Sequence, residues 1–176
     1  MAPKVRLTPS FFDKIVSGSE LAKKNSGEST SKLPQESFRK FFVSDVDRFT
    51  KEALHNTIRR DLTWLLNTLS FASARDLSKH PEVRTSVLNF GVKAFAGRSH
   101  SSRSELDNAR AIRDAIKRFE PRLDKISVTP NRDAVIDQRG KIAYIIDANI
   151  VIGRDFIPIR LQTEIDVESS TVEVRE

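Results

Sequence analysis

The hydrophobic period of the chain changes once, near Leu123, and this change constrains the fold more than any other feature of the sequence. Before it, apolar residues recur at every third or fourth position, as along one face of a helix. After it, apolar and polar residues alternate, so that Arg160 stands between Ile159 and Leu161, as in a strand with one buried face. Helices followed by an antiparallel meander predict an α+β domain, with N-terminal helices packed on a small, mainly antiparallel C-terminal sheet.

Three helices are expected before this change. The first covers about residues 44–68 and is capped by Ser44 or Asp45, the second covers 82–90, and the third covers 104–120. The apolar stripe of the first helix is expected to hold Val46, Phe49, Ala53, Ile58, Leu62, Leu65 and Leu69, with Thr57, Arg60 and Asp61 on its other face. The stripe of the third is expected to hold Leu106, Ala109, Ile112, Ile116 and Phe119.

Four strands are expected after the change, over residues 126–130, 142–152, 157–167 and 172–174. A turn at residues 153–155 joins the second strand to the third. These short connections favour antiparallel pairing between neighbours in sequence.

The length of 176 residues predicts one ordinary domain, or one domain with a tail. Residues 1–16 are expected to form an N-terminal docking segment, in which Phe11 and Ile15 share one helical stripe. Residues 17–43 are rich in Ser, Gly, Lys and Glu and are expected to be a flexible linker. Residues 44–176 then form a single α+β domain.

The composition excludes several chemistries. The chain has no cysteine, which excludes a disulfide scaffold, a thiolate zinc site and a cysteine nucleophile. His55, His80 and His100 lie on different expected elements without metal-ligand spacing, so no metal or cofactor is expected. No apolar run reaches membrane-spanning length and the opening residues lack a secretory stretch, so we expect a cytoplasmic protein without direct membrane insertion.

Charge is unevenly distributed along the chain. The net charge is +6 overall, but +5 over residues 45–125 and −3 over 126–176, a polarity that suits docking between unlike surfaces. Arg59, Arg60 and the basic side of the third helix could line a nucleic-acid stripe. One Trp and one Tyr offer few stacking platforms, however, so a solvated or partner-protein face is favoured. The basic residues of that helix are Arg110, Arg113, Lys117 and Arg118.

The tripeptide Glu120-Pro121-Arg122 stands where the last helix meets the first strand. It is either a helix stop with a local ion pair or a rigid docking corner, in which Arg122 captures a carboxylate on this chain or on a partner. Glu120 also has an apolar context, which a glycosidase acid requires. The neighbouring Arg118 and Arg122 favour its ionised form instead, so catalysis by this residue is disfavoured.

Three stretches of the chain together resemble the TssE family of type VI secretion baseplate subunits. They are residues 56–68, with the sequence NTIRRDLTWLLNT, residues 86–91, with SVLNFG, and residues 112–123, with IRDAIKRFEPRL. The opening RLTPSFFDKI also resembles the N-terminal segment of that family. The family is related to the wedge protein of contractile phage baseplates and has been labelled lysozyme-like.

The resemblance implies a structural protein rather than an enzyme. It implies that Glu120, Pro121 and Arg122 anchor the subunit to the baseplate core formed with TssF and TssG, in a wedge that also contains TssK. It further implies a C-terminal sheet similar to that of the sheath proteins TssB and TssC, and an assembled baseplate at the inner face of the inner membrane.

The mechanism expected from the sequence is strand addition. An edge strand presents unpaired N–H and C=O groups, which an extended segment of a neighbour could complete. The sequence leaves open which edge is free, and it leaves a peptidoglycan hydrolase and a basic nucleic-acid-binding module as alternatives. The residues expected on the sheath-facing strands are Leu161, Thr163, Ile165, Val172 and Val174.

Overall fold

The computed structural model describes residues 49–95, 102–131, 141–166, 169 and 171–175, together with the single positions Leu7, Pro9 and Asp13. The predicted linker at 17–43 and most of the docking segment at 1–16 lie outside the described residues. The chain divides into two compact units, Met1–Arg60 and Asp61–Glu176, which are treated separately below. Helix α3 (Lys51–Leu66) runs through the boundary between them.

In the first unit, α3 begins seven residues later than Ser44. Phe49 and Thr50 are not helical, and the hydroxyl of Thr50 accepts a hydrogen bond of 3.2 Å from the N–H of Ala53. Thr50 is thus the cap, because its side chain satisfies a donor that the first helical turn leaves unpaired. The polar face expected for this helix is also wrong at Thr57 and Arg60, whose exposed fractions are only 2% and 3%.

The buried Arg60 has a partner in the N-terminal segment. Its guanidinium forms an ion pair with the carboxylate of Asp13, and both side chains are 3% exposed. Asp13 is helical, as expected for its segment. A charge removed from water needs such a partner, so the pair explains how an arginine can lie in the interior of this unit.

In the second unit, the helix expected over 82–90 is split in two. The α-helix α4 (Pro81–Thr85) is followed by the 3₁₀ helix η3 (Val87–Asn89), and Ser86 between them has an extended backbone. The Ser86 hydroxyl accepts a hydrogen bond of 3.3 Å from the N–H of Leu88. Serine offers the backbone this alternative partner, which is why it starts a new turn rather than continuing the helix.

Two further helices complete this unit. The 3₁₀ helix η2 (Phe71–Ser73) follows α3, and α5 (Ser102–Phe119) precedes the sheet. The third predicted helix is therefore confirmed, with its start two residues earlier than expected.

Two residues expected on the apolar stripes are exposed instead. Leu69 is 61% exposed because it follows the end of α3, and Leu106 is 47% exposed because it lies at the border of the buried face of α5.

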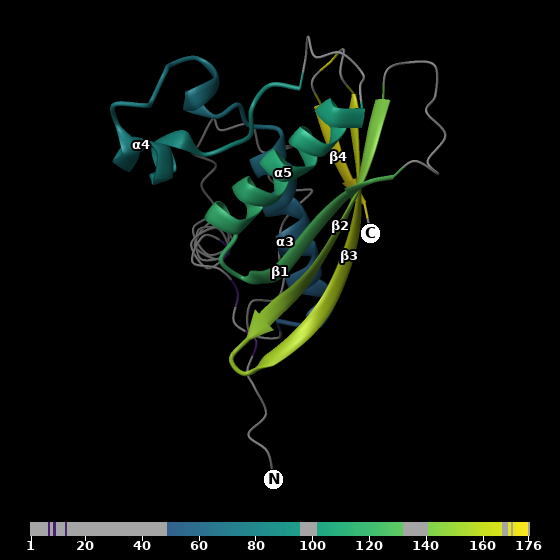
Figure 1. Cartoon of the computed structure of the whole chain (residues 1–176). Coiled ribbons are helices and arrows are strands. Elements are labelled where there is room, and N and C mark those ends of the chain that lie inside the picture. The colour runs from purple at the N-terminus through teal and green to yellow at the C-terminus, as the bar shows by residue number, and fades with distance from the viewer. Residues whose placement is uncertain are drawn as a thin grey trace, which may run out of the picture. The chain divides into compact units, whose positions relative to one another are not determined.

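The four predicted strands are confirmed, with small differences in their ends. They are β1 (Leu123–Pro130), β2 (Lys141–Ile152), β3 (Asp155–Asp166) and β4 (Thr171–Arg175). Neighbours in sequence pair antiparallel in the order β1-β2-β3-β4 (Figure 1). The chain is therefore an α+β protein with helices first and an antiparallel sheet after them, as predicted.

The core of this unit lies between α5 and one face of the sheet. Alternate residues of β2 and β3 are buried there, as their sequence predicts. The hydroxyl of Tyr144 donates a 3.4 Å hydrogen bond to the carbonyl of Glu105, which places α5 on this face. The residues that contribute most are Ala109, Ile112, Ile116, Tyr144, Ile146, Ile150, Leu161 and Ile165.

Candidate functional site

The sequence Glu120-Pro121-Arg122 forms a tight corner between α5 and β1. The Glu120 N–H still donates to the carbonyl of Ile116 at 2.8 Å, and the Leu123 N–H donates back to the carbonyl of Glu120 at 3.2 Å. Pro121 therefore occupies the second position of a four-residue turn, where its fixed φ is already suitable. The corner ends the helix and starts the strand within three residues.

Two carboxylates hold the Arg122 side chain at this corner. Its Nε and one terminal nitrogen donate to the two oxygens of Glu120 at 2.6 and 2.5 Å, and the latter nitrogen also lies 2.5 Å from Asp61 Oδ2. Burial lowers the pKa of the Arg122 guanidinium, but the hydrogen bonds and charges of Glu120 and Asp61 outweigh it and leave that pKa raised. Arg122 therefore stays charged at every accessible pH.

The structure thus brings Glu120 and Arg122 together, in the local ion pair that the sequence left as one of two possibilities. Glu120 is only 5% exposed, and both of its carboxylate oxygens accept from Arg122. Asp61 was missed as a partner because it lies on α3, 61 residues earlier in the chain. The Arg122 carbonyl accepts from the Val151 N–H at 2.8 Å, so the corner also fixes the end of the sheet.

The residues expected on sheath-facing strands all have buried side chains. Their exposed fractions run from 0% for Thr163 to 7% for Val174. The Thr163 hydroxyl donates to the carbonyl of Tyr144 at 3.2 Å, inside the sheet. Any partner strand must therefore be recognised through main-chain groups at an edge rather than through these five side chains. The remaining three are Leu161, Ile165 and Val172.

The direction of the main-chain groups follows from the turn between β2 and β3. Residues 153–154 form a two-residue turn, so Ile152 and Asp155 are a hydrogen-bonded pair. Pair types alternate along the ladder, so odd-numbered residues of β3 bond to β2 and even-numbered residues point the other way. The Val151 N–H, which donates to Arg122 at 2.8 Å on the β1 side, follows the same alternation.

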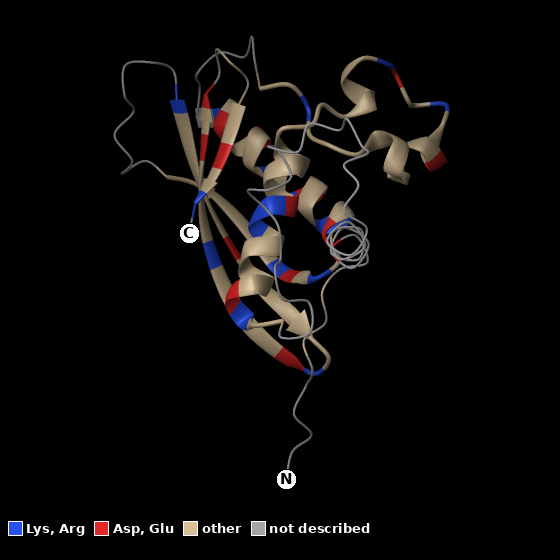
Figure 2. Ribbon diagram, turned by 180° about the vertical axis from the view of Figure 1, so that it is seen from behind, with Lys and Arg blue, Asp and Glu red and all other residues tan. Residues whose placement is uncertain are grey.

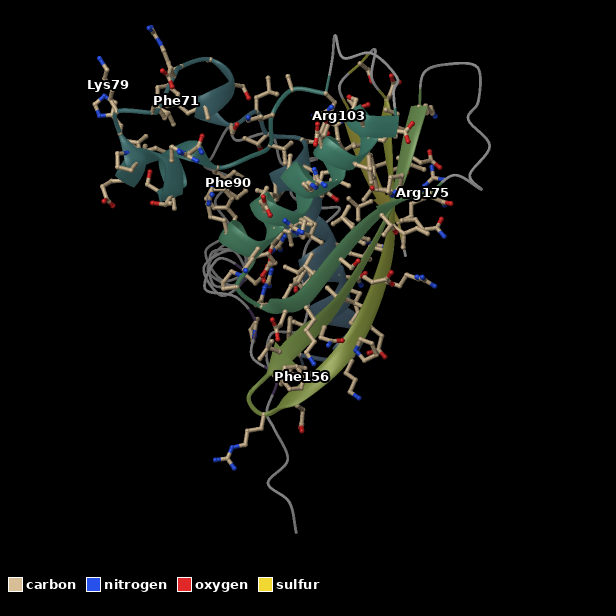
Figure 3. All side chains as sticks on the ribbon, in the orientation of Figure 1. Phe71, Lys79, Phe90, Arg103, Phe156 and Arg175 are labelled. Atoms are coloured by element: carbon tan, nitrogen blue, oxygen red, sulfur yellow. The ribbon has the colours of Figure 1, made fainter. Side chains whose placement is uncertain are left out.

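One half of β3 has an open edge. β4 pairs only with residues 162–166, and within the described part of the chain residues 155–161 have no neighbour on that side. The main-chain groups of Phe156, Pro158 and Arg160 point outward there, although proline has no N–H to offer. Figure 3 shows Phe156 near the end of the β2–β3 hairpin, well away from Arg175 at the end of β4.

The outer edges of β4 and β1 are less available than β3 for pairing with another strand. At β4, the Asn67 side chain donates to the carbonyl of Val172 at 2.7 Å and accepts from its N–H at 2.8 Å, so both outward groups of Val172 are already paired. At β1, a bulge between Asp124 and Ser127 interrupts the ladder, Lys125 has φ of 50°, and the strand ends in Pro130. Natural sheets blunt their edges with such features.

The proposed nucleic-acid stripe is not assembled as the sequence suggested. Arg60 is buried, and Arg110 and Arg113 pair with Asp107 and Asp114 at 3.1 and 2.8 Å. Among the described residues no cluster of three potential metal ligands occurs, and no described helix has the length and hydropathy of a membrane span.

A family profile for the baseplate wedge protein gp25 matches residues 52–153, which include the corner, all five described helical segments except the first residue of α3, and the strands β1 and β2. The chain belongs to the gp25 baseplate wedge family. This is the family that includes TssE, so the resemblance found in the sequence is confirmed. A search of curated proteins found no match.

Membership of the gp25 family gives the chain a structural role in a baseplate and suggests that it is not an enzyme. It also suggests other baseplate proteins as partners. The geometry of Glu120 agrees with this, since a bidentate ion pair occupies the carboxylate that a hydrolase would need. The match ends just before β3, so the open edge lies in the part of the chain outside it.

Proposed function

We propose that this chain is the TssE-type subunit of a type VI secretion baseplate and that it starts sheath polymerisation by strand addition. The wedge built on TssF and TssG, together with TssK, would hold it, and an extended segment of the TssB–TssC sheath would pair with β3. The cytoplasmic face of the inner membrane is the expected place of assembly. The observation that carries the proposal is the open edge of β3 at residues 155–161.

The strength of such pairing can be bounded from the outward groups. Arg160 and Phe156 each offer a donor and an acceptor, while Pro158 offers an acceptor alone. Each main-chain hydrogen bond contributes about 0.5–1.5 kcal/mol net, so five of them give a modest affinity. Simultaneous docking of the subunit on the wedge would raise the local concentration of the strand and make the pairing effective.

The Glu120–Arg122 corner has a positioning role in this proposal. It joins α5 to β1 rigidly and, through Val151, fixes the end of β2, which pairs with β3. A wedge partner that contacts the corner region would thereby hold the open edge in a defined orientation. The corner acts on sheath assembly through the sheet rather than by contacting the sheath.

A proline at position 160 tests the proposal. Arg160→Pro removes an outward N–H from the open edge without removing a bond to β2, so the protein should keep its thermal transition. Sheath formation, observed with a fluorescent sheath subunit in cells, should be lost or strongly reduced. Normal sheaths in this variant would contradict strand addition at β3.

Two matched variants complete this experiment. Arg160→Ala removes the same side chain, and with it the 2.9 Å ion pair to Asp147, but keeps the N–H, so sheaths should form. Leu161→Pro removes an inward N–H from the β2–β3 ladder and buries a proline in the core, so it should unfold the sheet. A Leu161→Pro variant with an unchanged thermal transition would show that the register of β3 is wrong.

A further inference from the structure

A polar groove in the second unit is used neither by the corner nor by the sheet edge. It has a volume of about 620 Å³ and lies between the segment 70–93 and one side of α5, from Asp107 to Arg118. Arg118 closes part of it by donating a 2.9 Å hydrogen bond to the carbonyl of Arg84. Phe90, labelled beside α5 in Figure 3, packs edge-on against Phe119 of that helix with ring centroids 5.3 Å apart, which ties this segment to α5.

Basic side chains are in excess in this groove, because five basic residues and three aspartates line it. Asp107 and Asp114 pair with arginines of α5, whereas Asp76 accepts from the N–H and hydroxyl of Ser78, which lower its pKa and favour its charged form. Within the described residues, the exposed side chains of Arg75, Arg84 and Lys93 form no ion pair. Figure 2 shows that acidic and basic positions are interspersed along α5 itself.

Exposed apolar side chains lie on the same segment. Val87 and Leu88 of η3 are 81% and 72% exposed, and Phe71 of η2 is 47% exposed. The two 3₁₀ helices are neighbours, because the Asn89 side chain accepts from the Ala72 N–H at 2.9 Å. Both 3₁₀ helices also contribute to the lining of the groove, through Ala72 and Asn89, and exposed apolar side chains next to such a polar groove are typical of a protein-binding surface.

We propose that this groove binds an acidic amphipathic segment of another baseplate protein. Carboxylates of the segment would meet Arg75, Arg84 and Lys93, and its apolar side chains would cover Val87 and Leu88. A nucleic acid fits less well, because it would leave the exposed aliphatic side chains of Val87 and Leu88 uncovered. The inference rests on the baseplate role but concerns a surface separate from the β3 edge.

A synthetic peptide tests this inference on the full chain. The probe is a fluorescein-labelled peptide of glutamate and alanine with leucine at every third or fourth position, and binding is followed by fluorescence anisotropy. The triple variant Arg75→Glu, Arg84→Glu and Lys93→Glu should weaken binding by at least about tenfold. The double variant Val87→Ser and Leu88→Ser should also weaken it, without changing the charge.

The matched control changes the net charge equally at exposed sites away from the groove. Its substitutions are Lys125→Glu, Lys141→Glu and Arg154→Glu, on the strands and the β2–β3 turn, and the peptide affinity should change by less than about threefold because none of these residues lines the groove. Equal losses in the two triple variants would overturn the inference in favour of bulk charge. Tighter binding of a single-stranded oligonucleotide, lost in the groove variant, would overturn it in favour of a nucleic-acid site.

Co-purification with the baseplate wedge separates this inference from the proposed function. The groove variant should recover less of the wedge, whereas Arg160→Pro should recover it normally and fail only in sheath formation. Full wedge recovery with the groove variant would overturn the groove inference and leave strand addition intact. Normal sheaths in Arg160→Pro, with poor wedge recovery in the groove variant, would overturn strand addition and leave the groove inference intact.

Discussion

At the scale of single residues, the corner shows how a charged group can be structural. Glu120 is almost completely buried, and its two oxygens face the planar fork of one arginine. A bidentate pair of this kind is specific in direction as well as favourable in energy. A lysine at position 122 could satisfy only part of this geometry, which explains why the corner uses an arginine.

Removal of the Glu120 carboxylate should destabilise the fold. Glu120→Ala leaves Arg122, whose side chain is 26% exposed, with Asp61 as its remaining carboxylate partner. We expect a loss of about 1–3 kcal/mol in the free energy of unfolding, measured by urea denaturation, because the partly buried Arg122 loses one of its two carboxylate partners. Glu82→Ala, an exposed change in the first turn of α4, is the control, and an equal midpoint in both variants would contradict a structural role for the corner.

The buried pair of Asp13 and Arg60 makes a sharper prediction. Asp13→Leu or Arg60→Leu alone removes one member of this buried ion pair and should lower the free energy of unfolding by about 3–5 kcal/mol. The double variant should recover most of this loss, since two apolar side chains can replace a buried ion pair at little cost. A double-mutant cycle measures the coupling, and strictly additive effects would show that the two charges do not interact.

At the scale of elements, α3 does more than cover a core. Its end is followed by Asn67, whose amide substitutes for a neighbouring strand at Val172. The first and last helices of the second unit therefore act on the sheet at opposite edges, α3 through Asn67 and α5 through the corner. One edge is therefore held by a side chain that follows α3, and the other end of the sheet is held by a main-chain carbonyl that follows α5.

Asn67→Ala tests the two hydrogen bonds between the Asn67 side chain and the main chain of Val172 in β4. The variant leaves the outward N–H and C=O of Val172 without their partner, so the amide proton of Val172 should exchange faster with solvent, by roughly tenfold or more if about 1.4 kcal/mol of local stability is lost. Hydrogen exchange followed by NMR measures this effect. Asn56→Ala, which removes a 3.0 Å surface hydrogen bond to Arg59, is the control and should leave Val172 unchanged.

Secondary structure was predictable where the period was long and regular. The alternation in β2 and β3 gave both their lengths and their buried faces, and the stripe around Ile112 gave α5. The segment near Ser86 was not predictable, because its backbone is decided by side-chain hydrogen bonds of Ser86 and Asn89. The start of α3 was missed for a similar reason, since several polar residues before Thr50 could each have served as a cap.

At the scale of the whole molecule, the sequence predicted the family, the α+β class and the Glu120-Pro121-Arg122 corner, but not the residues far along the chain that complete it. Glu120 and Arg122 are adjacent enough for their pairing to be foreseen, whereas Asp61 and Asn67 act across 61 and 105 residues of sequence. Contacts of that kind depend on tertiary packing and leave no trace in local periodicity. The open half of β3 could not be foreseen either, because it depends on where β4 ends.

Pro158 has a consequence for which molecules can meet at this edge. Two copies of the chain that paired through their β3 strands would bring two prolines into one interface, and two main-chain hydrogen bonds of the shared ladder would not form. If the partner strand contained no proline, only the one hydrogen bond that Pro158 cannot donate would be missing. The pyrrolidine ring of Pro158 thus disfavours self-association through this edge, but it still allows a strand of a different protein to pair there.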